Sequence, residues 1–294
     1  MKKLNNATGG RLALLTAAVI WGSSFIIMKD TVDHIPVFQL LAIRFTLAGL
    51  LLAVVFRKRL MQSKPALLGH GAICGIFLLA AYATQTYGLM TTSPGTNAFL
   101  TAVYCVMVPF MAWGFFRKRP TAYNWAAAAM CITGIGLISL SGDLTLGAGE
   151  ALTLLSGLFY ALHIMCLSHY GDQDDPIALT VVQFAVVAVL SWICTLTVEA
   201  GTPLPPPAVW PHLLYLTVFA TAVTLVCQSV GQSLTPPSQS AILLSLESVF
   251  GVFFSVLMGR ENLTVQLCAG FTLVFVSVIV SETQLSFLKR SKRT

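Results

Sequence analysis

Two ionisable side chains lie deep within long apolar runs of the sequence, and this position limits the chemistry that they can do. Arg44 falls within the run 37–56, and Glu247 lies near the middle of the run 241–258. A charge that faces hydrocarbon at a helix centre costs roughly 2.5 to 3.5 kcal/mol, so each side chain must face water, a protein partner or a ligand. Glu247 is suited to take up a proton or receive a cationic group, and Arg44 to order an outer vestibule or receive a carboxylate or phosphate. A buried ion pair between the two is an equally good structural alternative.

Neutral polar side chains recur at helical spacing within the other apolar runs. The clearest stripe has the spacing i, i+4, i+7, i+11 and consists of Thr217, Thr221, Thr224 and Gln228. Helices that face only lipid carry no such stripes, so the stripes indicate helices around a wet centre, although any single hydroxyl is equally well explained by packing. The candidate ligand-path residues are Trp21, Arg44, Gln85, Asn97, Tyr104, His163, Gln183, Gln228 and Glu247. For His163, a hydrogen-bonded packing role is the first interpretation and cavity lining the second.

The elements that must position these residues are ten apolar runs, which cover residues 12–28, 37–56, 67–89, 98–116, 122–140, 151–167, 177–198, 213–230, 241–258 and 267–280. The chain has 56% hydrophobic and only 10% charged residues, whereas a soluble domain has about a quarter charged residues. We therefore expect an all-α integral membrane protein with ten transmembrane helices. Pro109 lies well inside the fourth run, and we expect it to kink that helix.

The basic residues predict the orientation of the chain. If the amino terminus is cytoplasmic, fourteen of the seventeen lysines and arginines face the cytoplasm: Lys2, Lys3, Arg11, Arg57, Lys58, Arg59, Lys64, Arg117, Lys118, Arg119, Lys289, Arg290, Lys292 and Arg293. Positively charged loops stay cytoplasmic, so we expect both termini on the cytoplasmic side of the cell membrane. This bias also explains the net charge of +6, and binding of nucleic acid is not favoured.

Motifs for metal, cofactor or catalytic chemistry are not found in the sequence. The seven cysteines fall one to a run without C-x-x-C spacing, and His163 and His169 are six residues apart and do not share a helix face. Nucleotide-binding, zinc-protease and serine-hydrolase motifs are absent as well. We therefore expect no metal, no cofactor and no enzymatic activity.

The two halves of the chain repeat one another. A shift of 143 residues, without gaps, aligns Gln85 with Gln228, Gly88 with Gly231, Pro94 with Pro237, Phe110 with Phe253 and Arg117 with Arg260. The repeating unit has five spans, which is an odd number, so the second copy enters the membrane from the opposite side. We expect an inverted repeat with halves 1–143 and 144–294. The register sets Glu247 opposite Tyr104, and a weaker register of 139 sets Arg44 opposite Gln183.

Several motifs resemble the EamA-type domains of the drug/metabolite transporter superfamily. The best single marker is Ala18-x-x-Trp21-Gly22-Ser23-Ser24-Phe25, with support from the segments 95–100 and 246–261. Ser248 stands where the family often has proline, and Lys118 replaces an acid that only the second half retains, as Glu261. The resemblance implies ten helices around a central cavity, in a family that moves amino acids, metabolites, toxic compounds or sugar phosphates.

Together the resemblance, the repeat and the stripes favour a secondary transporter. We expect it to move a small organic metabolite across the membrane by alternating access, in the export direction and with possible proton coupling. The alternatives are an uptake carrier or exchanger of the same fold, a membrane-embedded enzyme, or a channel. The expected partners are the lipid bilayer and the small-molecule substrate, and no oligomeric state is predicted.

Overall fold

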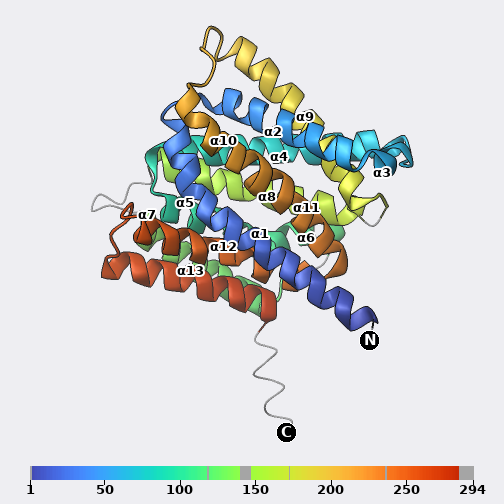
Figure 1. Cartoon of the computed structure of the whole chain (residues 1–294). Coiled ribbons are helices and arrows are strands. Elements are labelled where there is room, and N and C mark those ends of the chain that lie inside the picture. The colour runs from blue at the N-terminus through green and yellow to red at the C-terminus, as the bar shows by residue number, and fades with distance from the viewer. Residues whose placement is uncertain (1, 118, 140–146, 172, 236, 285–294) are drawn as a thin grey trace.

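The computed structural model describes residues 2–117, 119–139, 147–171, 173–235 and 237–284, and within these ranges every regular element is helical. Figure 1 shows the helices packed side by side as a bundle, with the amino-terminal end of α1 and the short helix α3 toward the same side of the view. The predicted boundary between residues 143 and 144, Lys118 and the basic residues after 284 lie outside the described ranges.

The helices follow the predicted apolar runs closely. Their bounds are α1 Lys2–Val32, α2 Val37–Val55, α3 Arg57–Met61, α4 Ala66–Thr91, α5 Pro94–Thr101, α6 Tyr104–Phe116, α7 Ala122–Ser139, α8 Ala148–Gly171, α9 Pro176–Thr197, α10 Trp210–Thr217, α11 Thr224–Leu234, α12 Pro237–Leu257 and α13 Val265–Thr283. A 3₁₀ turn, η1 (Pro207–Val209), precedes α10, and a π-helical segment, η2 (Val218–Val223), joins α10 to α11.

The described residues contain seven helical stretches that are long and apolar enough to cross a membrane: Thr8–Val32, Val37–Val55, Ala66–Thr91, Pro94–Met111, Ala148–Gly171, Pro176–Thr197 and Pro207–Leu234. Shorter apolar helices cover Leu243–Leu257 and Val265–Ser281. Large apolar side chains also remain exposed on the outside of the bundle, such as Val54 at 72% and Ile132 at 71%. An outer surface of this kind suits lipid and not water, so the membrane class is confirmed, whereas the count of ten spans stays a prediction.

The fourth predicted span is interrupted before Pro109 and not at it. Helix α5 ends at Thr101 and α6 begins at Tyr104. At this junction the N–H groups of Cys105 and Val106 donate to the carbonyls of Ala102 and Val103, three residues earlier, at 3.1 and 2.9 Å. Hydrogen bonds between residues three apart, as in a 3₁₀ helix, tighten the backbone where one helical segment joins the next. Pro109 itself lies inside α6.

The core lies between the two halves of the chain. Helix α1 packs against α11 and α12, α2 against α9, α4 against α8 and α9, α5 against α12, and α7 against α13. Each of these contacts joins a helix before residue 140 to one after residue 147. Figure 1 shows α7 and α13 together at one edge of the bundle. The centre is therefore formed by helices from both halves.

Small residues allow the closest of these helix contacts. A Cβ atom placed on Gly75 would lie 2.8 Å from the Cβ of Val186, and one on Gly71 would be closer than 3 Å to Val182. The small-xxx-small pair that the sequence shows at Gly71 and Gly75 is therefore a contact between α4 and α9.

The N-terminus of α2 is capped by an acid from the end of another helix. The carboxylate of Glu199, which lies just after α9, accepts the N–H groups of Phe38 and Gln39 at 3.0 and 2.9 Å. Each carboxylate oxygen accepts a hydrogen bond from a backbone N–H in the first turn of α2, which has no partner within the helix. The negative charge is also stabilised by the positive end of the helix dipole.

We expect Glu199→Gln to lower the free energy of unfolding by about 1 kcal/mol, because the amide loses the charge and one of the two acceptors. Thermal unfolding of the detergent-purified protein measures this change. Asp33→Asn serves as the control, since Asp33 is an exposed acid that lies just after α1 and not in the first turn of a helix. An equal effect of both substitutions would contradict the capping role.

Candidate functional site

A cavity of about 50 Å³ lies where helices of both halves converge. This volume holds a few water molecules in the present conformation. The side chains that line it come from α1, α2, α4, α5, α6, α8, α11 and α12 and are Trp21, Ser24, Phe25, Met28, Arg44, Tyr82, Gln85, Thr86, Leu89, Thr101, Tyr104, Tyr160, Ile164, Leu225, Gln228 and Glu247. None of the lining residues belongs to α7 or α13, the helices at the edge of the bundle.

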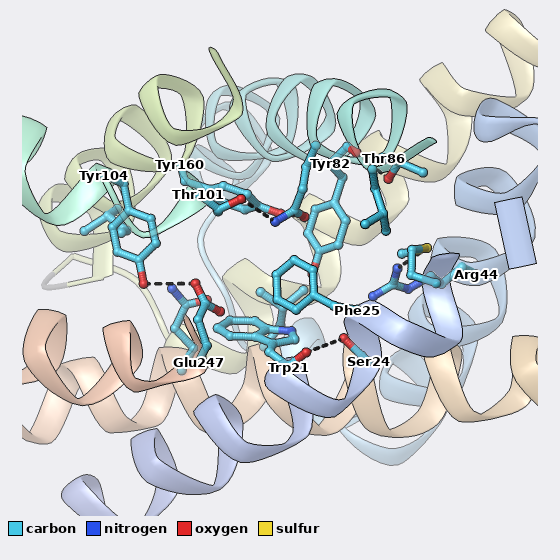
Figure 2. Close-up of a pocket in the computed structure, with 16 residues that line it drawn as sticks. Trp21, Ser24, Phe25, Arg44, Tyr82, Thr86, Thr101, Tyr104, Tyr160 and Glu247 are labelled. Carbon is cyan, nitrogen blue, oxygen red and sulfur yellow. Dashed lines mark hydrogen bonds between the residues drawn. The ribbon is translucent and has the colours of Figure 1, made fainter. Parts of the chain in front are cut away.

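Six of the nine residues that the sequence singled out lie in this cavity: Trp21, Arg44, Gln85, Tyr104, Gln228 and Glu247. Figure 2 shows Glu247 and Tyr104 at one end of it and Arg44 at the other, with Trp21 and Phe25 between them. The two charged side chains do not form an ion pair. The charges are therefore held separately at opposite ends of one cavity.

Arg44 is 1% exposed, and the protein itself supplies its partners. Its Nε donates to the hydroxyl of Thr221, Nη2 donates to the carbonyl of Ala220 at 3.1 Å, and Nη1 lies 3.9 Å from the sulfur of Met28. The guanidinium also sits 5.0 Å from the centre of the Tyr82 ring, in a cation–π contact. Each of its three nitrogens thus has a protein acceptor.

The π-helical segment η2 presents the backbone acceptor for Arg44. The carbonyl of Ala220 accepts a second hydrogen bond, from Nε1 of Trp21 at 3.0 Å, and the hydroxyl of Thr221 donates to the carbonyl of Leu216, five residues earlier, at 2.7 Å. π-Helical turns are rare and are frequently found at functional sites. Here the segment fixes Arg44 and Trp21 to the same point of the backbone.

We expect Thr221→Val to lower the free energy of unfolding by about 2 kcal/mol, because it removes a buried acceptor from a charged donor while keeping the side-chain shape. Thermal unfolding measures the loss. Thr272→Val is the matched control, since the Thr272 hydroxyl is exposed and bonds only to its own helix, at the carbonyl of Cys268. If the two variants unfold alike, Thr221 does not hold Arg44.

Glu247 is 6% exposed and has far fewer partners than Arg44. The hydroxyl of Tyr104 donates to its Oε1 at 3.3 Å, which is a long hydrogen bond. Oε1 of Gln228, another lining residue, is buried and has no hydrogen-bond partner. The lining of the cavity therefore has acceptor capacity that the protein does not use.

Tyr82 and Tyr160 complete the aromatic lining, together with Phe25, and none of the three was among the predicted site residues. Tyr160 donates to Oε1 of Gln85 at 2.9 Å, and Nε2 of Gln85 donates to the hydroxyl of Thr101 at 3.0 Å. The register of 139 also aligns Tyr160 with Trp21, and this alignment is the signal that could have identified Tyr160. Phe25 belongs to the family motif of the first apolar run, but the motif gave no reason to place its ring in a cavity, because an aromatic residue in an apolar run is most often a packing residue.

Asn97, His163 and Gln183 lie outside the cavity lining. His163 is 1% exposed, and its Nε2 makes a 2.6 Å hydrogen bond with Oε1 of Gln183, between α8 and α9. Asn97 donates to the hydroxyl of Thr153 at 2.8 Å, which joins α5 to α8. In this conformation all three side chains hold helices together.

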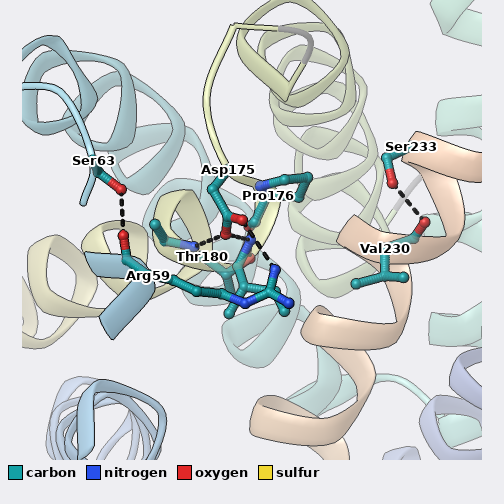
Figure 3. Close-up of polar contacts among 9 residues, drawn as sticks. Arg59, Ser63, Asp175, Pro176, Thr180, Val230 and Ser233 are labelled. Carbon is teal, nitrogen blue, oxygen red and sulfur yellow. Dashed lines mark hydrogen bonds and ion pairs between the residues drawn. The ribbon is translucent and has the colours of Figure 1, made fainter. Parts of the chain in front are cut away.

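Polar contacts also join the halves at the two ends of the bundle. At one end Arg59 pairs with Oδ2 of Asp175 at 3.0 Å, while Oδ1 of Asp175 caps α9; Figure 3 shows this arrangement. At the other end Arg260 pairs with Asp30 at 2.7 Å, and Glu261 accepts from the hydroxyl of Thr96 at 3.0 Å. In this conformation both ends of the bundle are bridged.

A helical membrane bundle with a central cavity, lined by aromatic and apolar side chains and a few polar ones, suits a multi-pass membrane transporter. Comparison with known families makes this specific: the sequence pattern of the EamA-like transporter family matches residues 8–140 and again residues 147–283. The chain belongs to this family, and the resemblance inferred from its motifs is confirmed.

Individual relatives agree with this assignment. An uncharacterized transporter of Archaeoglobus fulgidus is 31% identical over 283 residues, which cover 92% of this chain and 85% of the relative. The uncharacterized inner membrane transporter YedA of Escherichia coli is 23% identical, covering 92% of this chain and 89% of the relative. A crystal structure of a protein that is 16% identical matches the fold with a TM-score of 0.71, over 96% of this chain and 99% of that one.

Proposed function

We propose that the protein is a secondary carrier that moves a small organic molecule through the central cavity by alternating access. The observation that carries the proposal is the contact between Tyr104 and Glu247, which are 143 residues apart and occupy equivalent positions in the two halves. Equivalent positions of a two-fold arrangement meet only close to its axis. A binding cavity on such an axis, between two inverted halves of five helices each, suits rocking of one half against the other.

The bridges at both ends of the bundle and the small volume of the cavity support a cycle with distinct states. A substrate larger than a few water molecules needs the helices to separate at one end before it enters. Opening at either end breaks polar contacts between the halves, such as Arg59 with Asp175 or Arg260 with Asp30. Because each end has its own set, one end can open while the other stays closed.

The direction of transport that we propose is export across the cytoplasmic membrane, with both termini in the cytoplasm. The orientation rests on the basic residues of the termini and short loops, and the direction on the resemblance to exporters of metabolites. An exchanger of the same fold is the second candidate, since two nearly symmetric states favour exchange.

Counterflow in proteoliposomes tests the carrier mechanism. Vesicles that contain the purified protein are loaded with a panel of unlabelled amines, amino acids and carboxylates, and uptake of a trace of each labelled compound is followed. A carrier accelerates uptake of the label when its substrate is inside the vesicle. Uptake that does not depend on the internal compound indicates a channel, and no uptake of any compound would contradict the proposal.

A further inference from the structure

We propose that the cavity recognises the ammonium group of a primary amine and does not require a carboxylate on the same molecule. The inference rests on the proposed function only in taking this cavity as the substrate site. It follows from the hydrogen bonding of the two ionisable side chains in the lining: Arg44 has several protein partners, whereas Glu247 has one long hydrogen bond.

Arg44 already has protein partners around its guanidinium. Its nitrogens already contact Thr221, Ala220 and Met28, one face of the guanidinium lies on the Tyr82 ring, and the residue is 1% exposed. A carboxylate that bound side-on to Nε and Nη2 would have to displace the hydroxyl of Thr221 and the carbonyl of Ala220. One that bound end-on to Nη1 and Nη2 would have to take the place of the Met28 sulfur. Its role in the cavity is therefore to fix η2 and Trp21 and to supply a positive charge at one end.

The cavity lining also holds two acceptors that the protein leaves little used. Glu247 has one long hydrogen bond, from Tyr104, and the buried Oε1 of Gln228 has none, although Gln228 is only 5% exposed. An unpaired acceptor buried in a membrane protein is costly, so a ligand with N–H donors is stabilising there. A primary ammonium has three donors and a positive charge, which match these two acceptors.

Aromatic rings surround the place where the ammonium would lie. Trp21, Tyr104 and Tyr160 line the same cavity; Figure 2 shows Tyr104 at the Glu247 end and Trp21 next to Glu247, on the side toward Arg44. Ring faces attract cations and pack against the carbon chain of an amine. The Arg44 charge at the far end repels a second cation, so the site favours monoamines over diamines and orients the amine toward Glu247.

Calorimetric titration of the detergent-purified full-length protein tests the proposal with two matched series. One series is n-butylamine, norvaline and pentanoate, and the other is phenethylamine, phenylalanine and 3-phenylpropionate. Each series carries one side chain with the ammonium alone, with both groups, or with the carboxylate alone. We expect an amine to bind at least as tightly as its amino acid, and the carboxylates and 1,4-diaminobutane to bind more weakly by about tenfold or more.

The variants give an independent reading. Glu247→Gln keeps the shape of the side chain and removes its charge, and Gln228→Leu removes the unpaired acceptor. Each substitution should weaken amine binding by about tenfold. Glu150→Gln, outside the cavity, is the control and should not change amine binding. Two results overturn the proposal: a carboxylate that binds as tightly as its amine, or failure of every amine to bind. Amine binding without counterflow would contradict the carrier mechanism alone, and counterflow of carboxylates without amine binding would contradict this inference alone.

Discussion

Valine in place of Gly22 is expected to prevent the close packing of α1 on α12 and to destabilise the bundle by about 3 kcal/mol, because the extra atoms have no space and the neighbours cannot retreat. A Cβ atom on Gly22 would lie 2.9 Å from the backbone nitrogen of Gly251 and closer still to Phe250. The obstacle is mostly backbone, so no change of rotamer relieves it. Trp21, the adjacent residue, lines the cavity, so a shift of α1 displaces the site as well.

Thermal unfolding in detergent and gel filtration measure this effect, and we expect the midpoint to fall by about 5 to 10 °C. Gly69→Val is the matched control. Gly69 also lies within a helix, α4, but nothing lies within 4 Å of a Cβ atom placed there. Both variants carry the same change in helix propensity, so the difference between them reports the packing of α1 on α12. Equal stability of the two would show that this contact is not tight.

Glu247→Gln is expected to lower the rate of counterflow by about a hundredfold, because it removes the charge of Glu247 from the cavity. This carboxylate is buried in the lining and has few protein partners. Tyr104→Phe, which removes only the hydroxyl that donates to Glu247, is expected to cost about threefold. The probe is the compound that the wild-type protein exchanges fastest. Gel filtration of both variants verifies that they fold.

The same variant separates proton coupling from binding of a cationic group. If Glu247 takes up a proton during the cycle, counterflow by the wild-type protein changes with pH, and the residual activity of Glu247→Gln does not. If Glu247 only binds the substrate, the pH dependence persists in the variant. Full activity of the glutamine variant at every pH would remove Glu247 from both roles.

The repeat in the sequence related two residues of the site, but it did not predict that they touch. A shift of 143 residues placed Tyr104 opposite Glu247, and the two side chains are hydrogen bonded. The shift relates positions and says nothing about contacts. Arg44 and Gln183, equivalent in the weaker register, bond to different helices, Arg44 to η2 and Gln183 to His163.

The partners of Arg44 could not be predicted, because they depend on a local change of helix type. In η2 the backbone leaves the α-helical pattern over Val218–Val223. An α-helix and a short π-helical turn expose nearly the same residue pattern, so the sequence shows Thr217, Thr221 and Thr224 as one stripe in either case. Only the packed structure shows that the carbonyl of Ala220 and the hydroxyl of Thr221 hold the guanidinium.

The sequence by itself determined that this protein lies in a membrane, where its helices are and to which family it belongs. Those properties depend on apolar runs, breaks and short motifs, which are local along the chain. The tertiary structure decided which polar residues share a cavity and which of them keep unused hydrogen-bonding capacity. His163 and Glu247 are both polar residues in apolar runs, yet His163 is paired with Gln183 while Glu247 faces the cavity. The difference depends on the rotation of each helix against its neighbours, and packing between the two halves sets that rotation.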